Sequence, residues 1–287
     1  MTPATASRPA PRRRGVLARA ARLARVRVGI ALVALVGAVA LIGPFVAPHG
    51  TTDYVARPHT APAAGAVFGT DYLGQDVWTR FLHGGRPVVV IASLAAALGV
   101  LAGALVGISA AWGRGRMSAV VMRGVDVALA VPPILLALVA IAAAEATPWL
   151  VVGVVTVVTA PRVARVAHGA AAVVVEQDFV ELSASIGESR RSIVVREVLP
   201  NVSGPLLVES AIRLTYAVAL VSSLAFLGLT TGVNAANWGL MVQENRGAFT
   251  VQPWGVLLPA AGIVAFTLGV GLVADGLART HSSWGRP

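Results

Sequence analysis

Long apolar runs alternate with short polar segments along most of the chain, and this pattern predicts a set of membrane-spanning helices. A helix needs about 20 residues to cross the hydrocarbon core of a bilayer. The bilayer offers the backbone no hydrogen-bond partners, so each run is expected to be helical. The runs cover residues 28–47, 88–111, 119–144, 149–166, 205–229 and 254–274. We therefore predict an all-α polytopic membrane protein with about six transmembrane helices.

The third and fourth of these runs are interrupted by polar or helix-breaking residues. The third contains Asp126 and the pair Pro132 and Pro133. Prolines free backbone carbonyls and should kink this helix, and such a break needs neighbours or a water-filled cavity around it. Asp126, Pro132 and Pro133 are therefore candidate residues of a translocation path, although a kink that serves only packing explains the prolines equally well. In the fourth run, the side chains of Arg162 and Arg165 are expected to reach the inner interface.

Two pairs of opposite charge lie at helical spacing inside the apolar runs. Arg123 and Asp126 are three residues apart, and Glu209 and Arg213 are four apart. Either pair can form an ion pair on one face of its helix. Charges inside a membrane are expected to be functional or to hold helices together.

Composition supports a membrane protein, because 56% of the residues are hydrophobic and only 13% are charged, whereas a soluble domain carries about 25% charged residues. The net charge is +10 and every basic residue is arginine. Such a charge could indicate nucleic-acid binding, but in so apolar a chain the arginines are expected to set membrane topology instead. There is no cysteine, which excludes disulfides and thiolate metal sites.

The distribution of arginine predicts the orientation. If the N-terminus is cytoplasmic, most arginines fall in inner segments, and the outer segments hold only Arg57, Arg80, Arg86 and Arg246. This asymmetry favours both termini in the cytoplasm. The chain is expected to begin with a basic cytoplasmic tail that contains an interfacial amphipathic helix (residues 1–27), followed by one transmembrane helix (28–47) and an extracytoplasmic loop (48–87). A transmembrane core (88–276) and a cytoplasmic tail (277–287) complete the expected order.

One long polar segment separates the fourth and fifth apolar runs, at residues 176–200, and it is predicted to form two short helices on the cytoplasmic side. The first should carry an apolar or small-residue stripe and end at Gly187, because glycine adopts the left-handed conformation without steric cost. Pro200 is expected to close the second helix. Such a unit suits docking into a partner's groove, and the alternative is an amphipathic loop at the lipid surface. The stripe consists of Phe179, Leu182, Ser183 and Ile186.

This segment resembles the EAA loop of bacterial ABC-importer permeases. The matching residues are Glu181, Gly187, Ile193, Leu199 and Pro200. Leu182 and Ser183 stand where the family pattern has small residues, and alanine appears only at Ala184. The resemblance implies that the loop couples the chain to a separate ATP-hydrolysing subunit.

A second segment, residues 68–86, resembles a signature of the peptide/nickel subgroup of these permeases. Glycines in it permit tight turns, and Asp71, Asp76, Arg80 and Arg86 can form a local charge network. Gln75 and Thr79 depart from the usual Arg and Ser. The alternative is a generic charged turn, which the number of matches at fixed spacing disfavours. The matching residues that we carry forward are Gly69, Thr70, Asp71, Gly74, Asp76 and Arg80.

Together these resemblances imply a permease subunit of a binding-protein-dependent ABC importer in a bacterial cytoplasmic (inner) membrane, most simply one for di- or oligopeptides. The alternatives are a nickel, metal-chelate or oligosaccharide importer and, from a different class, a membrane-embedded enzyme. The family implies a second homologous permease, one or two cytoplasmic ATPases that bind ATP and Mg²⁺, an extracytoplasmic substrate-binding protein and contact with membrane lipid. No nucleic-acid partner and no cofactor in this chain are expected.

The sequence carries no recognisable catalytic motif. The phosphate-binding pattern G-x-x-x-x-G-K-[ST] and the zinc pattern H-E-x-x-H are both missing, so the chain is not expected to hydrolyse ATP itself. The five histidines are scattered and unpaired at helical spacing, which argues against a metal site built by this chain alone. We therefore expect a translocation subunit without catalytic activity.

Overall fold

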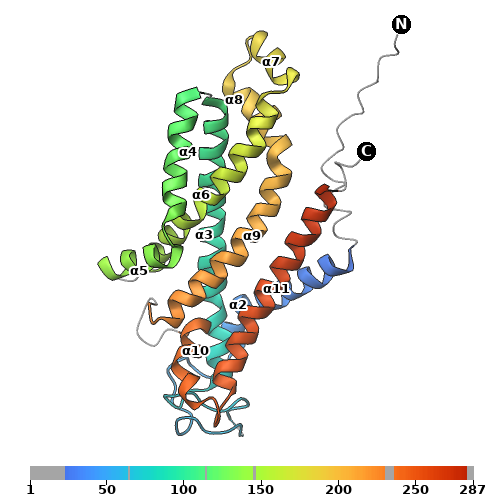
Figure 1. Ribbon diagram of the computed structural model, residues 1–287. Coiled ribbons are helices and arrows are strands. Elements are labelled where there is room, and N and C mark those ends of the chain that lie inside the picture. The colour runs from blue at the N-terminus through green and yellow to red at the C-terminus, as the bar shows by residue number, and fades with distance from the viewer. Residues whose placement is uncertain (1–22, 64, 114, 145–146, 230–235, 283–287) are drawn as a thin grey trace.

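Helices form most of the chain that the computed structural model describes, which comprises residues 23–63, 65–113, 115–144, 147–229 and 236–282 (Figure 1). Among these residues, five helices are long and apolar enough to cross a membrane, or six if the bent pair α4 and α5 counts as one span. The predicted all-α polytopic architecture is therefore confirmed. The helices are α2 (Ala24–Val46), α3 (Val77–Gly113), α4 (Gly115–Ala130), α5 (Pro133–Ala143), α6 (Pro148–Val175), α7 (Asp178–Ser185), α8 (Arg190–Ile193), α9 (Leu199–Phe226), α10 (Trp238–Asn245) and α11 (Trp254–Ser282), with a π-helical segment η1 (Val194–Val198) and a 3-10 turn η2 (Arg246–Ala248).

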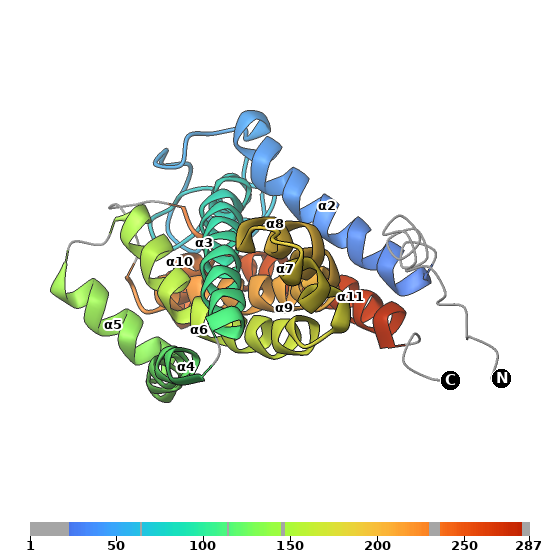
Figure 2. The same cartoon turned by 90° about the horizontal axis from the view of Figure 1, so that it is seen from above.

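Three helices, α3, α6 and α9, pack against one another at the centre. Seen from above, α2 lies along one side of the molecule, whereas α4 and α5 lie on the opposite side (Figure 2). The short helices α7 and α8 are at one end of the bundle, and α10 lies at the other end beside the loop that joins α2 to α3 (Figure 1). Two surfaces that could meet soluble partners are thus held at opposite ends.

The contact between α3 and α6 depends on three glycines spaced by four residues. A Cβ atom on Gly103 would lie 2.4 Å from the Ala160 carbonyl oxygen, and one on Gly107 would lie 2.3 Å from the Ala164 oxygen. A Cβ on Gly99 would meet the Thr159 side chain at 2.8 Å. Small residues at this spacing let the backbones of two membrane helices approach closely.

A second close approach joins α2 to α11. A Cβ on Gly29 would lie 2.7 Å from the Gly269 carbonyl oxygen. Near the end of this contact, Asp275 accepts hydrogen bonds from Arg25 at 3.0 Å and Arg279 at 3.2 Å. The first and last described helices are therefore paired.

Helix α3 begins earlier than the apolar pattern indicates, so residues 77–87 belong to this helix and not to the outer loop. Asp76 caps it, because its Oδ2 accepts hydrogen bonds from the backbone N–H and the hydroxyl of Thr79 at 2.9 and 2.7 Å. The first turns are polar in sequence but buried, since Thr79 and Arg80 expose 0% and 1% of their surface. Hydropathy alone therefore misplaces this boundary.

The prolines agree with the predicted helix boundaries in one case and differ from them in two. The kink expected at Pro132 and Pro133 is present, because α4 and α5 meet there at 82°. The fourth span runs on through Pro161 to Val175, beyond its expected end. Pro200 does not end a helix: it lies in the first turn of α9, which continues from α8 through η1. The wider π-helical turn before Pro200 accommodates the proline ring and its missing N–H.

Parts of the terminal tails lie outside the described residues. They include residues 15–22 of the expected interfacial helix and the last residues of the C-terminal tail, 283–287. The described part of the N-terminal segment begins at Leu23 and enters α2 at Ala24.

The glycine contact between α3 and α6 makes a stability prediction. Gly103→Ala should lower the free energy of unfolding by about 1–3 kcal/mol, because the added methyl group overpacks a backbone contact. Gly153→Ala is the control, since a Cβ on Gly153 meets nothing within 4 Å. Thermal unfolding in detergent, followed by tryptophan fluorescence, should show a lower midpoint for Gly103→Ala alone. Equal midpoints for both variants would contradict the close approach.

Candidate functional site

At the α7 end of the bundle, a short helix is closed by a glycine in the left-handed conformation. Gly187 has φ +87°. The N–H of Gly187 donates to the Ala184 oxygen at 3.2 Å, and the N–H of Glu188 donates to the Ser183 oxygen at 3.1 Å. These two bonds form a Schellman cap. The end of α7 is therefore where the glycine was expected to place it.

The outward face of α7 is apolar and exposed. Phe179, Leu182 and Ile186 expose 44%, 64% and 71% of their surface. Val180, on the opposite face, is 3% exposed and packs toward the bundle. We call Phe179, Leu182 and Ile186 the α7 patch. Such apolar exposure on an otherwise charged segment is typical of an interaction surface.

Ser183 does not share this outward face. Its hydroxyl donates a 2.6 Å hydrogen bond to Glu197 in η1. Ile193 and Val198 lie on either side of Glu197 in the sequence, at the ends of α8 and η1, and expose only 1% and 0% of their surface. Ser183 therefore links α7 to the segment that leads into α9. The sequence spacing had instead grouped it with the apolar stripe.

A groove of about 470 Å³ lies beneath α7, and Glu181 and Ala184 line it. Its other wall includes Trp112 at the end of α3. Of the remaining residues matched to the EAA pattern, Leu199 is 40% exposed at the start of α9 and Pro200 follows it in the first turn. The structure thus gathers the pattern into one loop unit but separates its outward and groove-facing residues.

The candidate path residues lie around the α4–α5 bend. Pro133 lines a small cavity of about 70 Å³ and a larger one of about 310 Å³. Asp126 forms an ion pair with Arg165 of α6, and not with Arg123 as its spacing suggested. Its side chain is 52% exposed. The bend therefore borders two partly open cavities, while Asp126 ties α4 to α6.

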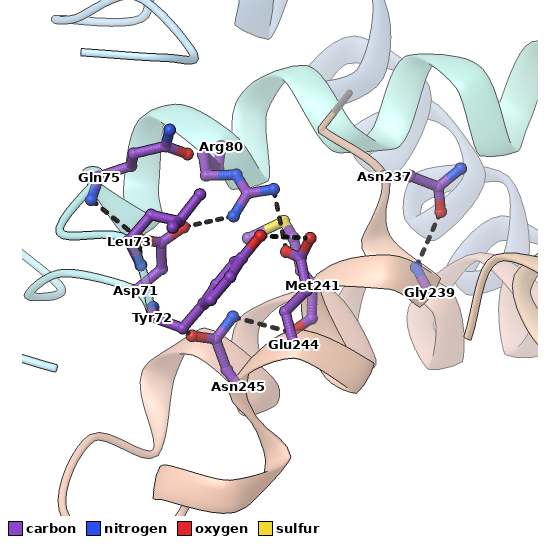
Figure 3. Close-up of polar contacts among 10 residues, drawn as sticks. All are labelled: Asp71, Tyr72, Leu73, Gln75, Arg80, Asn237, Gly239, Met241, Glu244 and Asn245. Atoms are coloured by element: carbon purple, nitrogen blue, oxygen red, sulfur yellow. Dashed lines mark hydrogen bonds and ion pairs between the residues drawn. The ribbon is translucent and has the colours of Figure 1, made fainter. Parts of the chain in front are cut away.

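At the opposite end, the guanidinium of Arg80 lies between two carboxylates (Figure 3). One terminal nitrogen pairs with Asp71, and the other lies 3.0 Å from Glu244 Oε2 in α10. Tyr72 reinforces the junction, because its hydroxyl donates to Glu244 Oε1 at 3.1 Å and its backbone N–H donates to Asn245 Oδ1 at 3.1 Å. This cluster, which we call the Arg80 junction, joins the loop before α3 to α10.

The turn that carries Asp71 is built by two glycines with positive φ. Gly69 and Gly74 have φ +73° and +82°, and a Cβ on either would lie within 2.3 Å of a backbone oxygen. In the turn that these glycines permit, Asp71 Oδ1 accepts hydrogen bonds from the N–H groups of Leu73 and Gln75 at 2.9 and 2.8 Å. The signature residues therefore shape and charge one turn.

Two more signature residues bind the rest of the outer loop. The Thr70 hydroxyl donates to the Arg57 carbonyl at 2.6 Å and accepts the N–H of Thr60 at 2.9 Å. Asp76, besides capping α3, lies 3.6 Å from His49. Arg86 is exposed and stands apart from the Arg80 junction.

Sequence reasoning missed Tyr72, Glu244 and Asn245. Tyr72 lies within residues 68–86 but is not one of the residues that match the signature, and α10, with Glu244 and Asn245, falls in a stretch that hydropathy assigned to a loop. The only available signal was the presence of a lone Glu-Asn pair within a mostly uncharged outer segment. That signal indicates polarity but not a partner in a distant part of the chain.

Burial raises the pKa of the Glu244 carboxyl above its ordinary value and outweighs the attraction of Arg80. The charge of Arg80 is already shared with Asp71. Burial, and then the neighbouring Glu244 carboxylate, also raise the pKa of the Tyr72 hydroxyl. Tyr72 therefore remains a hydrogen-bond donor at neutral pH.

Comparison with known proteins decides the family. Residues 99–283 match the family described as the binding-protein-dependent transport system inner membrane component. The chain belongs to this family. It is thus the permease subunit of an ABC importer, and the predicted resemblance of the chain to such permeases is confirmed.

Relatives extend the match beyond the family region. A protein of Brucella suis named as a peptide transport system permease is 34% identical over 255 residues, which cover 88% of this permease and 85% of the relative. A protein of Escherichia coli named as a D,D-dipeptide transport system permease is 29% identical over 239 residues, or 83% and 80% of the two chains.

A solved structure shares the fold. The inward-facing MetNI methionine ABC transporter matches with a TM-score of 0.54 and 18% identity, and the match covers 71% of this permease and 95% of the other chain. At this identity the likeness speaks for the fold alone. Within the described part of the permease, no three His, Asp or Glu side chains gather where they could hold a metal ion.

The raised pKa of Glu244 gives a pH prediction. The folded permease holds this proton more tightly than the unfolded chain, so the stabilising contribution is fully present below the ordinary glutamate pKa, about 4.3. It is lost as the pH rises through the raised value. The unfolding midpoint of the wild type, relative to that of Glu244→Gln, should therefore fall as the pH rises from about 4 to 8.

The same comparison contains its own control, because every other titrating group is common to the two proteins. Thermal unfolding in detergent across this pH range measures the difference directly. A difference that stays constant, or that grows in favour of the wild type with rising pH, would contradict the raised pKa.

Proposed function

We propose that this permease imports di- or oligopeptides, together with a second homologous permease that supplies the other half of the path. The substrate class rests on the relatives, which are named as peptide and dipeptide transport permeases. One or two cytoplasmic ATPases would bind ATP and Mg²⁺ and supply the energy. The permease itself would contribute no catalytic group.

The observation that carries the coupling proposal is the α7 patch together with its attachment. The patch is apolar and exposed, which suits a groove on the ATPase, and the acidic side chains Asp178 and Glu181 lie in the first turn of α7. The Ser183–Glu197 hydrogen bond fastens α7 to η1. A displacement of α7 would therefore also displace the start of α9.

Helix α9 would carry that displacement into the membrane. It runs without a break from α8 and η1 to Phe226, and it contains the buried Glu209–Arg213 ion pair, in which Arg213 Nε lies 2.8 Å from the carboxylate. ATP binding would favour one arrangement of the helices and its hydrolysis would release it. Such a shift requires that ATP bind the two states with different affinity.

The Arg80 junction is proposed to hold together the extracytoplasmic surface that receives the substrate-binding protein. It joins the outer loop to α10 and so fixes these two segments to each other at the end opposite α7. This placement puts both termini and α7 in the cytoplasm, in a bacterial inner membrane with lipid around the bundle. The arginine asymmetry along the chain supports this orientation.

A substitution in the α7 patch tests the coupling. Leu182→Asp should reduce ATP-driven peptide uptake at least tenfold, because it places a charge in an apolar interface. Met117→Asp is a matched control, since Met117 is 69% exposed at the same end of the bundle but on α4. Uptake is measured in cells with equal amounts of each variant in the membrane. Wild-type uptake by Leu182→Asp would overturn the coupling role of the patch.

The orientation can be tested with single cysteines, because the natural chain has none. A membrane-impermeant maleimide should label Thr52→Cys in intact spheroplasts, since this residue is exposed in the outer loop. It should label Ser185→Cys on α7 only after the membrane is permeabilised. The reverse labelling pattern would place α7 outside and exclude contact with an ATPase.

A further inference from the structure

The larger of the two cavities beside the α4–α5 bend has a volume of about 310 Å³ and lies between α5, α6 and α9. Its wall is apolar at Ile134, Val158 and Leu220, and it carries two arginines, Arg162 and Arg213. This volume is at the lower end of the range for small-ligand sites. Polar groups within an otherwise apolar wall are what orient a ligand in such sites.

Arg213 is held in a fixed position. It is 9% exposed, its Nε lies 2.8 Å from Glu209 Oε1, and its guanidinium lies 4.8 Å from the centroid of the Tyr216 ring. Glu209 and Tyr216 thus hold one edge and one face of the group. Among the described residues, none accepts a hydrogen bond from its two terminal nitrogens, which remain available on a wall of the cavity.

Arg162 adds a second positive charge without a partner. It is half-buried on α6, and no acceptor or carboxylate in the described ranges engages it. The nearby acid Asp126 is already paired with Arg165. The cavity therefore contains two guanidinium groups against the single carboxylate of Glu209. Charges in a membrane protein are normally paired, so this excess indicates an anionic ligand.

We propose that this cavity binds the terminal carboxylate of the transported peptide through Arg162 and Arg213. A guanidinium presents parallel N–H donors that match the two oxygens of a carboxylate. Every peptide with a free C-terminus carries that group, whatever its side chains, and the apolar wall suits varied side chains. This inference rests on the proposed peptide function and names the part of the substrate that the permease itself contacts.

The test uses the complete reconstituted transporter in proteoliposomes, with its binding protein and ATP. The probes are radiolabelled trialanine and trialanine amide, which differ in the terminal carboxylate, each supplied at a concentration that saturates the binding protein. Arg162→Gln is the main variant, because it removes a cavity charge without breaking an ion pair among the described residues. Arg123→Gln is the matched control, because Arg123 lies on α4 outside the cavity lining and the acid three residues away, Asp126, is paired with Arg165 instead.

Arg162→Gln should lower uptake of trialanine about tenfold, which is the effect of losing one charged hydrogen bond, and change uptake of the amide less than twofold. Arg162→Lys should restore most of the trialanine uptake. Arg123→Gln should not discriminate between the probes. Dividing each variant's rate by that of the wild type cancels the preference of the binding protein, and ATP hydrolysis by the complex reports whether assembly is intact.

The double variant Glu209→Gln/Arg213→Gln removes the buried pair without leaving either charge alone, and it should show the same selective loss. Equal losses for both probes in the Arg162→Gln and double variants, or no loss for either, would overturn the carboxylate site while leaving peptide import in place. Failure of the wild-type complex to take up either probe would instead overturn the peptide function, and this site with it.

Discussion

The close approach of α3 and α6 sets the geometry on which both ends of the permease depend. Gly99, Gly103 and Gly107 bring the two backbones together, and van der Waals contact of this kind is a main source of helix association in a bilayer. Helix α3 extends from the Arg80 junction at one end to Trp112 beneath α7 at the other. A single helix, fixed against α6, therefore spans the distance between the two surfaces proposed to meet soluble partners.

Charge is distributed differently at the junction and inside the bundle. Arg80 is almost fully buried, but Asp71 and Glu244 both pair with it, so the junction holds the outer loop and α10 together. The cavity between α5, α6 and α9 has fewer carboxylates than guanidinium groups. A buried charge that the protein leaves without a partner is costly, and a ligand that supplies the partner offsets that cost. The paired charges of the Arg80 junction therefore fit a structural role, whereas the unpaired charges of the cavity fit the binding of a ligand.

The sequence predicted the helical class, the bend at Pro132 and Pro133, and the end of α7 at Gly187, because hydropathy, proline geometry and glycine conformation act locally. It misplaced the start of α3, where buried polar residues such as Thr79 are satisfied by capping, and it misjudged Pro200, because a π-helical turn accommodates the ring. The Glu244–Arg80 and Asp126–Arg165 pairs join distant segments. No local spacing encodes such partners, so only the packed structure reveals them.

This permease is proposed to work as one part of an ATP-driven import complex. The most direct measurement is purification of the tagged chain from native membranes in mild detergent, with mass spectrometry of the retained proteins and small molecules. We expect to recover a second permease, one or two ATPases and a substrate-binding protein that carries peptides. Recovery of the permease without any ATPase, even after crosslinking through a cysteine placed at Glu181, would contradict it.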